Sequence, residues 1–277
     1  MSALDVPGAR LYYECRGSGP TFVLVPGANG DARVFGKVAE HLAEHYTVIT
    51  YDRRGFSRST LHGAQDYEHR LKTDADDVRR LIEHVGEGPA TVFGTSSGGV
   101  IVLELLVRHP SVVATLAPYE PAAMKQLDDA QHWLDLLFGL YDLYRRSGIE
   151  PALQDFRELF SEADRPIMSR ATNRELNEHA HANVTYWFER ELRQYTTVDL
   201  DIDALTPHAG RIVLVSGEQS RGYPNYRVNQ ELGRKLGREV IELPGGHTGF
   251  AAHPAEFARR LRDATILPPH HDVTSQP

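Results

Sequence analysis

The sequence predicts an α/β fold: a mostly parallel, eight-stranded sheet covered by helices on both faces and interrupted by one helical insertion. Strand-like and helix-like segments alternate through the first 120 residues, and the alternation resumes at about residue 208. Helical patterns dominate the interval between them. Because parallel strands need crossover connections, such alternation is typical of a parallel sheet with helices on its faces.

The expected strands are short runs rich in β-branched and aromatic residues, bounded by Gly, Pro and polar turns. They cover residues 9–15, 21–25, 46–51, 90–93, 112–117, 211–216 and 239–243. The expected helices have apolar residues at helical spacing. They cover residues 32–43, with Asp31 as a cap, and 71–85, 98–109, 131–146, 152–160, 173–195, 226–236 and 255–263.

These elements divide the chain into a core, a lid and a tail. Residues 1–120 and 208–264 form the expected sheet core, residues 121–207 a helical lid, and residues 265–277 a flexible tail. The lid is rich in aromatic residues, most of which are expected to pack a core. Where such a lid also roofs a cavity, its aromatic side chains favour an apolar or aromatic substrate.

Composition and charge restrict the functional class. The chain has 277 residues, a formal net charge of −8 and one cysteine, Cys15. An acidic chain repels phosphate backbones, so nucleic acid is not an expected partner. One cysteine allows no intramolecular disulfide, and the sequence has neither a signal-peptide pattern nor a membrane-spanning apolar run. We therefore expect a cytoplasmic protein with no membrane partner, either a monomer or a homodimer.

The candidate nucleophile is Ser96, in the segment Gly94-Thr-Ser-Ser-Gly98. This G-x-S-x-G string stands between an expected strand and an expected helix, where a sharp turn presents a serine at the carboxyl edge of a sheet. Free N–H groups at the start of the helix favour a developing negative charge. A serine here makes acyl transfer the natural reaction, and the alternative is a glycine-rich turn without chemistry.

Among fourteen histidines, position selects His247 as the candidate general base. It lies in Pro244-Gly-Gly-His247, after the last expected strand and before the last expected helix. Loops that follow parallel strands gather at the carboxyl edge of the sheet, where Ser96 is also expected. The alternative is a surface histidine in a glycine-rich loop.

In these motifs and their order, the chain resembles the α/β-hydrolase superfamily over nearly its whole length. Val25-Pro-Gly27, Tyr51-Asp-Arg-Arg-Gly-Phe-Ser57, the serine turn and Pro244-Gly-Gly-His247 follow one another as in that family. The resemblance implies the α/β-hydrolase fold, with its chain order of serine before histidine.

The same resemblance implies an oxyanion hole. In this fold the loop after the first central strand donates one backbone N–H, and the residue after the nucleophile donates the other. These donors map to Ala28 and Ser97, with Gly27 and Asn29 beside the substrate in the first loop. The alternative is an ordinary strand-to-helix turn.

The acid that orients His247 departs from the commonest family pattern. That pattern places an aspartate as G-x-x-D after the strand 211–216, but this chain has Gly217-Glu-Gln-Ser220. A minority arrangement takes the acid from the end of the strand after the nucleophile, where Glu120 stands. We assign Glu120 to accept the His247 Nδ1–H. Glu218 is the alternative, with Glu120 then a surface loop residue.

This minority arrangement is similar to that of the zearalenone lactone hydrolases. Their C-S-S-G and H-E-x-P motifs resemble Thr95-Ser-Ser-Gly98 and Tyr119-Glu-Pro121. They also have no acid after the later strand, and they carry a lid tryptophan that contacts the substrate. The resemblance implies this last role for Trp187.

The sequence thus predicts a serine hydrolase that cleaves a small apolar or aromatic ester or lactone through an acyl-enzyme on Ser96. No cofactor or metal is expected. The alternatives are a C–C bond hydrolase on the same three residues and a non-catalytic ligand receptor that keeps the fold. An incomplete triad favours the receptor, so the acid distinguishes the two classes.

Overall fold

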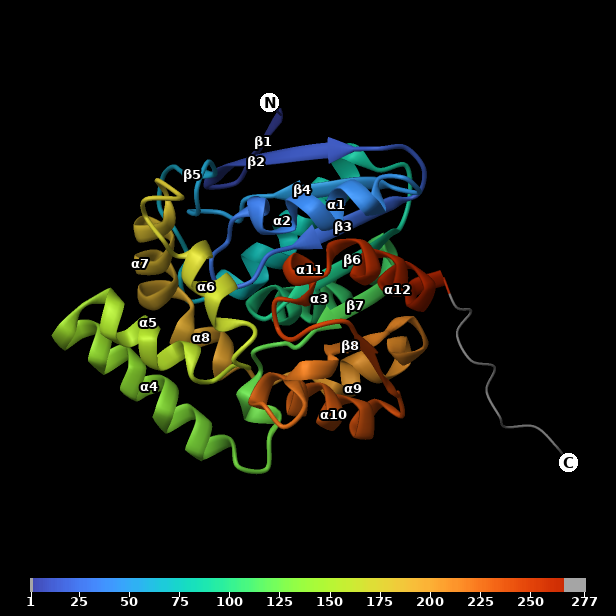
Figure 1. The fold of residues 1–277 in the computed structure, drawn as a ribbon. Coiled ribbons are helices and arrows are strands. Elements are labelled where there is room, and N and C mark those ends of the chain that lie inside the picture. Colours follow the sequence, from blue (N-terminus) through green and yellow to red (C-terminus); the bar gives the residue numbers. More distant parts are fainter. Residues whose placement is uncertain (1, 267–277) are drawn as a thin grey trace, which may run out of the picture.

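The computed structural model describes residues 2–266, in which helices cover both faces of a mostly parallel sheet (Figure 1). The strand order is β1-β2-β4-β3-β6-β7-β8-β9, and a two-residue strand, β5, pairs with β2. The predicted α/β architecture is therefore confirmed. The sheet has nine strands where eight were predicted, and β1 and β5 lie outside the seven expected strand ranges. The strands are β1 (Ser2–Val6), β2 (Ala9–Arg16), β3 (Thr21–Val25), β4 (Thr47–Tyr51), β5 (Thr60–Leu61), β6 (Ala90–Thr95), β7 (Val113–Tyr119), β8 (Leu214–Gly217) and β9 (Val240–Leu243).

The helices fall before, within and after the long interval between β7 and β8. The α-helices are α1 (Gly36–Leu42), α2 (Arg70–Val85), α3 (Ser97–Arg108), α4 (Ala130–Ser147), α5 (Ile149–Arg157), α6 (Arg165–Ala171), α7 (Ala180–Arg190), α8 (Leu192–Thr196), α9 (Ile202–Leu205), α10 (Pro224–Leu236), α11 (Gly249–Ala252) and α12 (Pro254–Ile266). The 3₁₀ helices are η1 (Ala32–Phe35), η2 (Pro110–Val112), η3 (Met124–Gln126), η4 (Thr206–Arg211) and η5 (Glu218–Ser220).

The central strand β3 is buried on both faces. Phe22 and Leu24 pack in the cluster that contains side chains of α1 and α12. Val23 and Val25 pack in the cluster that contains side chains of α2, α3 and α10. Successive side chains of a strand point to opposite faces, so two helical layers need apolar residues at consecutive positions, as in Phe22–Val25.

Some expected elements differ in the structure. The expected helix 173–195 begins only at Ala180, and it is divided into α7 and α8 at Glu191, whose φ of −126° lies outside the helical region. The Glu191 carboxylate is buried against Arg53 and Arg70, and this pairing occurs where the helix is interrupted. Strand β1 was not expected because four of its five residues are not buried and give no apolar alternation.

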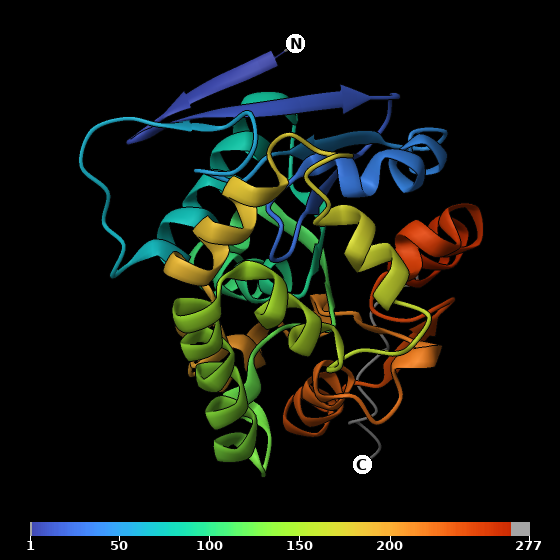
Figure 2. The same ribbon diagram turned by 60° about the vertical axis from the view of Figure 1, so that its left-hand side comes forward.

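Helices α4–α8, here called the lid, gather on one side of the sheet, at the left of Figure 1. Figure 2 brings these helices to the front of the sheet. They fall within the predicted insertion 121–207, whereas α9, near the end of that interval, packs against α3 and α10 of the sheet domain. The lid side chains therefore face the edge of the sheet at which β3, β6 and β9 end.

At its carboxyl end, helix α12 continues to Ile266 and takes in the first residues of the predicted tail 265–277. The rest of that predicted tail lies outside the described residues. Within residues 2–266, no helix combines the length and the apolar character needed to cross a membrane.

Candidate active site

Ser96 occupies a tight turn between β6 and α3. Its φ of 55° is a sparsely populated backbone conformation for a residue other than glycine, at a cost of about 1–3 kcal/mol. Two glycines make the turn possible: a Cβ on Gly94 would lie 2.3 Å from Gly98 O, and one on Gly98 would lie 2.3 Å from Val25 O. The turn places Ser96 on the wall of a cavity at the carboxyl edge of the sheet, where it is 8% exposed.

His247 lies in the loop between β9 and α11, and Glu120 directly follows β7. His247 Nδ1 is 2.6 Å from Glu120 Oε2 although the residues are 127 positions apart. Both side chains are buried. A buried carboxylate at Nδ1 favours the tautomer with its proton there, which leaves the Nε2 lone pair free to accept a proton.

The structure holds Glu120 in place from several sides. Gly217 N–H donates to Glu120 Oε1 at 2.8 Å, and Asn225 Nδ2 donates to Glu120 O at 3.0 Å. The φ of Glu120 is 46°, so this residue also adopts a strained backbone conformation. Ser96 N–H donates to Tyr119 O at 3.0 Å, which ties the serine turn to the end of β7.

Tyr119, the last residue of β7, contacts the loop that carries His247. Its hydroxyl donates to Gly246 O, and its ring stacks near the His247 ring with centroids 6.5 Å apart. Burial raises the pKa of Tyr119 well above its usual value, so the hydroxyl remains a donor. Glu218, the alternative acid, does not contact His247 among the described residues. Its side chain is 47% exposed, and Arg260 lies 4.0 Å from its carboxylate.

Ser96 and His247 line the same cavity. No hydrogen bond joins their side chains in the part of the chain that the structure describes. Contacts between a nucleophile and its base are often long before substrate binds and tighten in the complex. The arrangement thus needs a local adjustment to bring the hydroxyl and Nε2 together.

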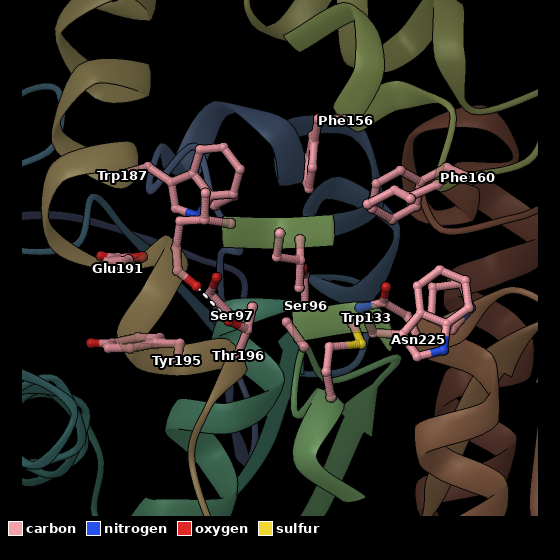
Figure 3. Close-up of a pocket in the computed structure, with 17 residues that line it drawn as sticks. Ser96, Ser97, Trp133, Phe156, Phe160, Trp187, Glu191, Tyr195, Thr196 and Asn225 are labelled. Atoms are coloured by element: carbon pink, nitrogen blue, oxygen red, sulfur yellow. Dashed lines mark hydrogen bonds between the residues drawn. The ribbon is translucent and has the colours of Figure 1, made fainter. Parts of the chain in front are cut away.

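The two candidate oxyanion donors belong to residues that line a cavity with Ser96. Ala28 and Ser97 line a second, smaller cavity together with Ser96 (Figure 3). Within residues 2–266, neither backbone N–H donates a hydrogen bond to another protein group. Ser97 begins α3, so its N–H also carries the partial positive charge of a helix N-terminus. Both donors are therefore available to a negatively charged oxygen at the serine.

The residues expected beside the substrate all line the larger cavity, which has a volume of about 690 Å³. Gly27 and Asn29 contribute from the loop after β3. Trp187 contributes from α7, and its ring centroid is 4.8 Å from that of Phe156. In Figure 3, Trp187, Phe156 and Phe160 lie above Ser96. The serine therefore faces an aromatic roof supplied by the lid.

Sequence reasoning missed Asp164, a buried lid residue that holds the histidine loop. His247 N–H donates to Asp164 Oδ2 at 3.0 Å. The N–H and hydroxyl of Thr248 both donate to Oδ1 at 2.7 Å. Asp164 belongs to no motif, and its partners in the histidine loop lie more than eighty positions away, so the sequence carries no signal for this role.

A second missed group is a buried ion-pair network behind the oxyanion loop. Arg53 donates to Gly27 O at 2.8 Å and to Glu191 Oε2 at 2.7 Å. Arg70 donates to Glu191 Oε1 at 2.8 Å. Burial alone would lower the pKa of Arg53, but Glu191 and Asp74 outweigh it and raise this pKa. Arg53 lies in the motif Tyr51–Ser57, which the family resemblance singled out. Nothing in that motif indicates that Arg53 pairs with Glu191.

No metal site accompanies these groups. Within residues 2–266, no three His, Cys, Asp or Glu side chains are placed to hold a metal ion together.

Comparison with known proteins identifies the class to which this fold and site belong. The family described as "alpha/beta hydrolase fold" matches residues 20–254. The chain therefore belongs to the α/β-hydrolase family, as its motifs predicted.

Individual relatives agree with this assignment. The protein "Uncharacterized hydrolase YraK" of Bacillus subtilis (strain 168) is 38% identical over 269 residues, which cover 94% of each chain. A zearalenone hydrolase of Bionectria ochroleuca is 33% identical over 277 residues, covering 95% of this chain and 97% of its own. The predicted resemblance to zearalenone hydrolases is thereby confirmed. This chain is a hydrolase of the α/β-hydrolase type.

The fold also matches solved structures at low sequence identity. The enol-lactonase from Burkholderia xenovorans LB400 has a TM-score of 0.73 at 18% identity, covering 96% of this chain and 100% of that one. At this identity the likeness concerns the fold.

Proposed function

We propose that this chain is a serine hydrolase that cleaves an apolar or aromatic ester or lactone through an acyl-enzyme on Ser96. One observation carries the proposal: the buried Glu120 carboxylate lies 2.6 Å from Nδ1 of His247, and His247 lines the same cavity as Ser96. A serine beside a histidine that a carboxylate orients can act as a nucleophile with its base, once the Ser96 hydroxyl and His247 Nε2 come together.

The reaction follows from the position of each group. His247 Nε2 accepts the hydroxyl proton as Ser96 Oγ bonds to the carbonyl carbon, and the carbonyl oxygen takes the negative charge. The N–H groups of Ala28 and Ser97 bind that oxygen, and Glu120 stabilises the imidazolium. Collapse breaks the bond to the alkoxy oxygen, which takes the proton from Nε2. Water, deprotonated by His247, then releases the acid and regenerates Ser96.

The substrate class is supported by the cavity and by relatives. The aromatic roof of Trp187, Phe156 and Phe160 favours an apolar or aromatic group next to the scissile bond. A zearalenone hydrolase and an enol-lactonase are among the similar proteins, which supports a lactone as well as a linear ester.

A fluorophosphonate probe tests the proposal. The wild-type protein should gain one phosphonyl group on Ser96 and should hydrolyse aryl acetates, and Ser96→Ala should do neither. Ser169→Ala, which removes an exposed lid hydroxyl, is the matched control and should behave like the wild type. Absence of labelling and of turnover in the wild type would reject the proposal in favour of a receptor that keeps the fold. Cleavage of a β-diketone but of no ester would favour the C–C hydrolase.

We also propose a cytoplasmic location, without nucleic-acid or membrane partners. The net charge of −8 and the single cysteine support it. Fractionation of cells that produce the protein at its natural level tests it, and recovery with the membranes would contradict it.

A further inference from the structure

Two cavities of very different size meet at Ser96. The smaller one, of about 20 Å³, holds roughly one water-sized group, and its walls are mostly apolar. Its one charged wall residue, Glu191, is already paired with Arg53 and Arg70. The larger one, of about 690 Å³, extends from Ser96 and His247 beneath the lid. A substrate cleaved at Ser96 therefore has a small part and a large part, and the large part occupies the larger cavity.

The larger cavity is basic, although the chain as a whole has a net charge of −8. One acidic residue, Asp31, lines it. Its basic lining residues are Arg33, Lys37, Arg157 and Arg170. Asp31 is already paired with Arg33 at 2.6 Å. Three cationic side chains of this lining therefore have no carboxylate within 4.0 Å among the residues that the structure describes.

Arg157 is the best placed of these three cations. It ends α5 and is partly buried, whereas Lys37 and Arg170 are exposed. Among the residues that the structure describes, its guanidinium has one hydrogen bond, from Nη2 to Thr172 Oγ1 at 2.9 Å. Burial lowers the pKa of Arg157, opposed only by the charge of Glu150. A partly buried guanidinium without an acidic partner is incompletely compensated, and an anion in the cavity would compensate it.

Aromatic side chains line the same cavity as this guanidinium. Phe156 precedes Arg157 in the chain, lines both cavities and contacts the Trp187 ring. A molecule that extends from Ser96 into the larger cavity meets apolar ring faces as well as a guanidinium. This lining matches an aromatic or apolar group that carries a negative charge.

We propose that the hydrolase prefers esters or lactones whose larger part carries a carboxylate, which Arg157 binds in the cavity beneath the lid. This inference rests on the proposed function, because it assumes cleavage at Ser96. It adds a charge to the substrate class, with the planar guanidinium fork of Arg157 matched to the two carboxylate oxygens.

A matched pair of aryl acetates tests the preference. In para-acetoxybenzoate and para-acetoxybenzamide the acetyl group suits the small cavity, and the ring carries either a carboxylate or a neutral group of similar shape. The wild type should show a higher kcat/KM on the benzoate, and raising the ionic strength should reduce this preference.

Arg157→Gln separates this role from a structural one. We expect it to lower kcat/KM about 10-fold on the benzoate, mainly through KM, and to leave the benzamide nearly unchanged. For each ester, kcat/KM of the variant is divided by that of the wild type, so the intrinsic reactivity of the ester cancels. The control Arg146→Gln removes an exposed cation of α4 outside the cavity lining and should change neither ester.

The outcomes distinguish the two levels of the proposal. An equal loss on both esters in Arg157→Gln, or no loss on either, overturns the carboxylate site and leaves the serine hydrolase standing. Failure of the wild type to cleave either ester, together with no fluorophosphonate labelling of Ser96, overturns the proposed function and this inference with it.

Discussion

Glu120 and Glu191 are both buried glutamates, and each is 1% exposed, but their partners differ in charge. The Glu120 carboxylate contacts His247 Nδ1 and accepts from Gly217 N–H, with no Lys or Arg within 4.0 Å among the described residues. The Glu191 carboxylate is paired with the guanidinium groups of Arg53 and Arg70. One acid is thus held by groups without a permanent charge and the other by permanent cations.

Under the proposed mechanism, this difference separates a catalytic carboxylate from a structural one. The charge of Glu120 is not neutralised by a permanent cation, so in that mechanism it would stabilise the imidazolium of His247. The charge of Glu191 is neutralised at all times, and the pairing joins the junction of α7 and α8 to Arg53, which also holds Gly27 O. Removing the first charge should affect turnover, and removing the second should affect stability.

The largest expected effect comes from Glu120→Gln. It keeps the shape of the side chain but removes the charge and the preference for the Nδ1–H tautomer. We expect kcat on an aryl acetate to fall about 10³–10⁴-fold, with little change in thermal unfolding. The control Glu218→Gln should retain nearly full activity. The opposite pattern, with loss in Glu218→Gln only, would assign the acid to η5.

The next largest effect is expected for Glu191→Gln. Two buried guanidinium groups lose one of the two carboxylates that they share and keep Asp74, so the free energy of unfolding should fall by about 3 kcal/mol, measured by urea denaturation. Asp129→Asn breaks the exposed pair with Arg227, 2.9 Å apart, and should cost less than about 1 kcal/mol. Similar costs for the two variants would contradict a stabilising role for the buried network.

Asp164→Asn should have the smallest effect of the three. It replaces one of two acceptor oxygens that hold the His247 loop, so we expect a loss of about 1–2 kcal/mol in unfolding free energy. A less ordered histidine should also lower kcat about 10-fold with little change in KM. Asp155→Asn, on the same lid but exposed, is the control. A rise in KM with no change in kcat would show that Asp164 acts on the substrate cavity instead.

Much of the fold was predictable because its signals are local. Apolar runs such as 21–25 and helical spacing such as 71–85 are properties of short segments, and both elements appear close to the expected bounds. The exposed strand β1 and the division of helix 173–195 at Glu191 were not predictable. Strand β1 has no apolar pattern. The division at Glu191 accompanies its ion pairs with Arg53 and Arg70, which lie over a hundred positions away.

In the candidate site, too, some residues are recognisable from local sequence and others depend on tertiary contacts. A glycine-flanked serine between a strand and a helix, and a histidine after the last strand, are recognisable from neighbouring residues alone, so the sequence by itself determined Ser96 and His247 as candidates. It left Glu120 and Glu218 as alternatives for the acid. Only the tertiary structure decided which carboxylate reaches the imidazole, because side-chain reach depends on how β7, β8 and β9 are placed side by side. The same reason applies to Asp164 and Arg157, whose surroundings exist only once the lid is folded over the sheet.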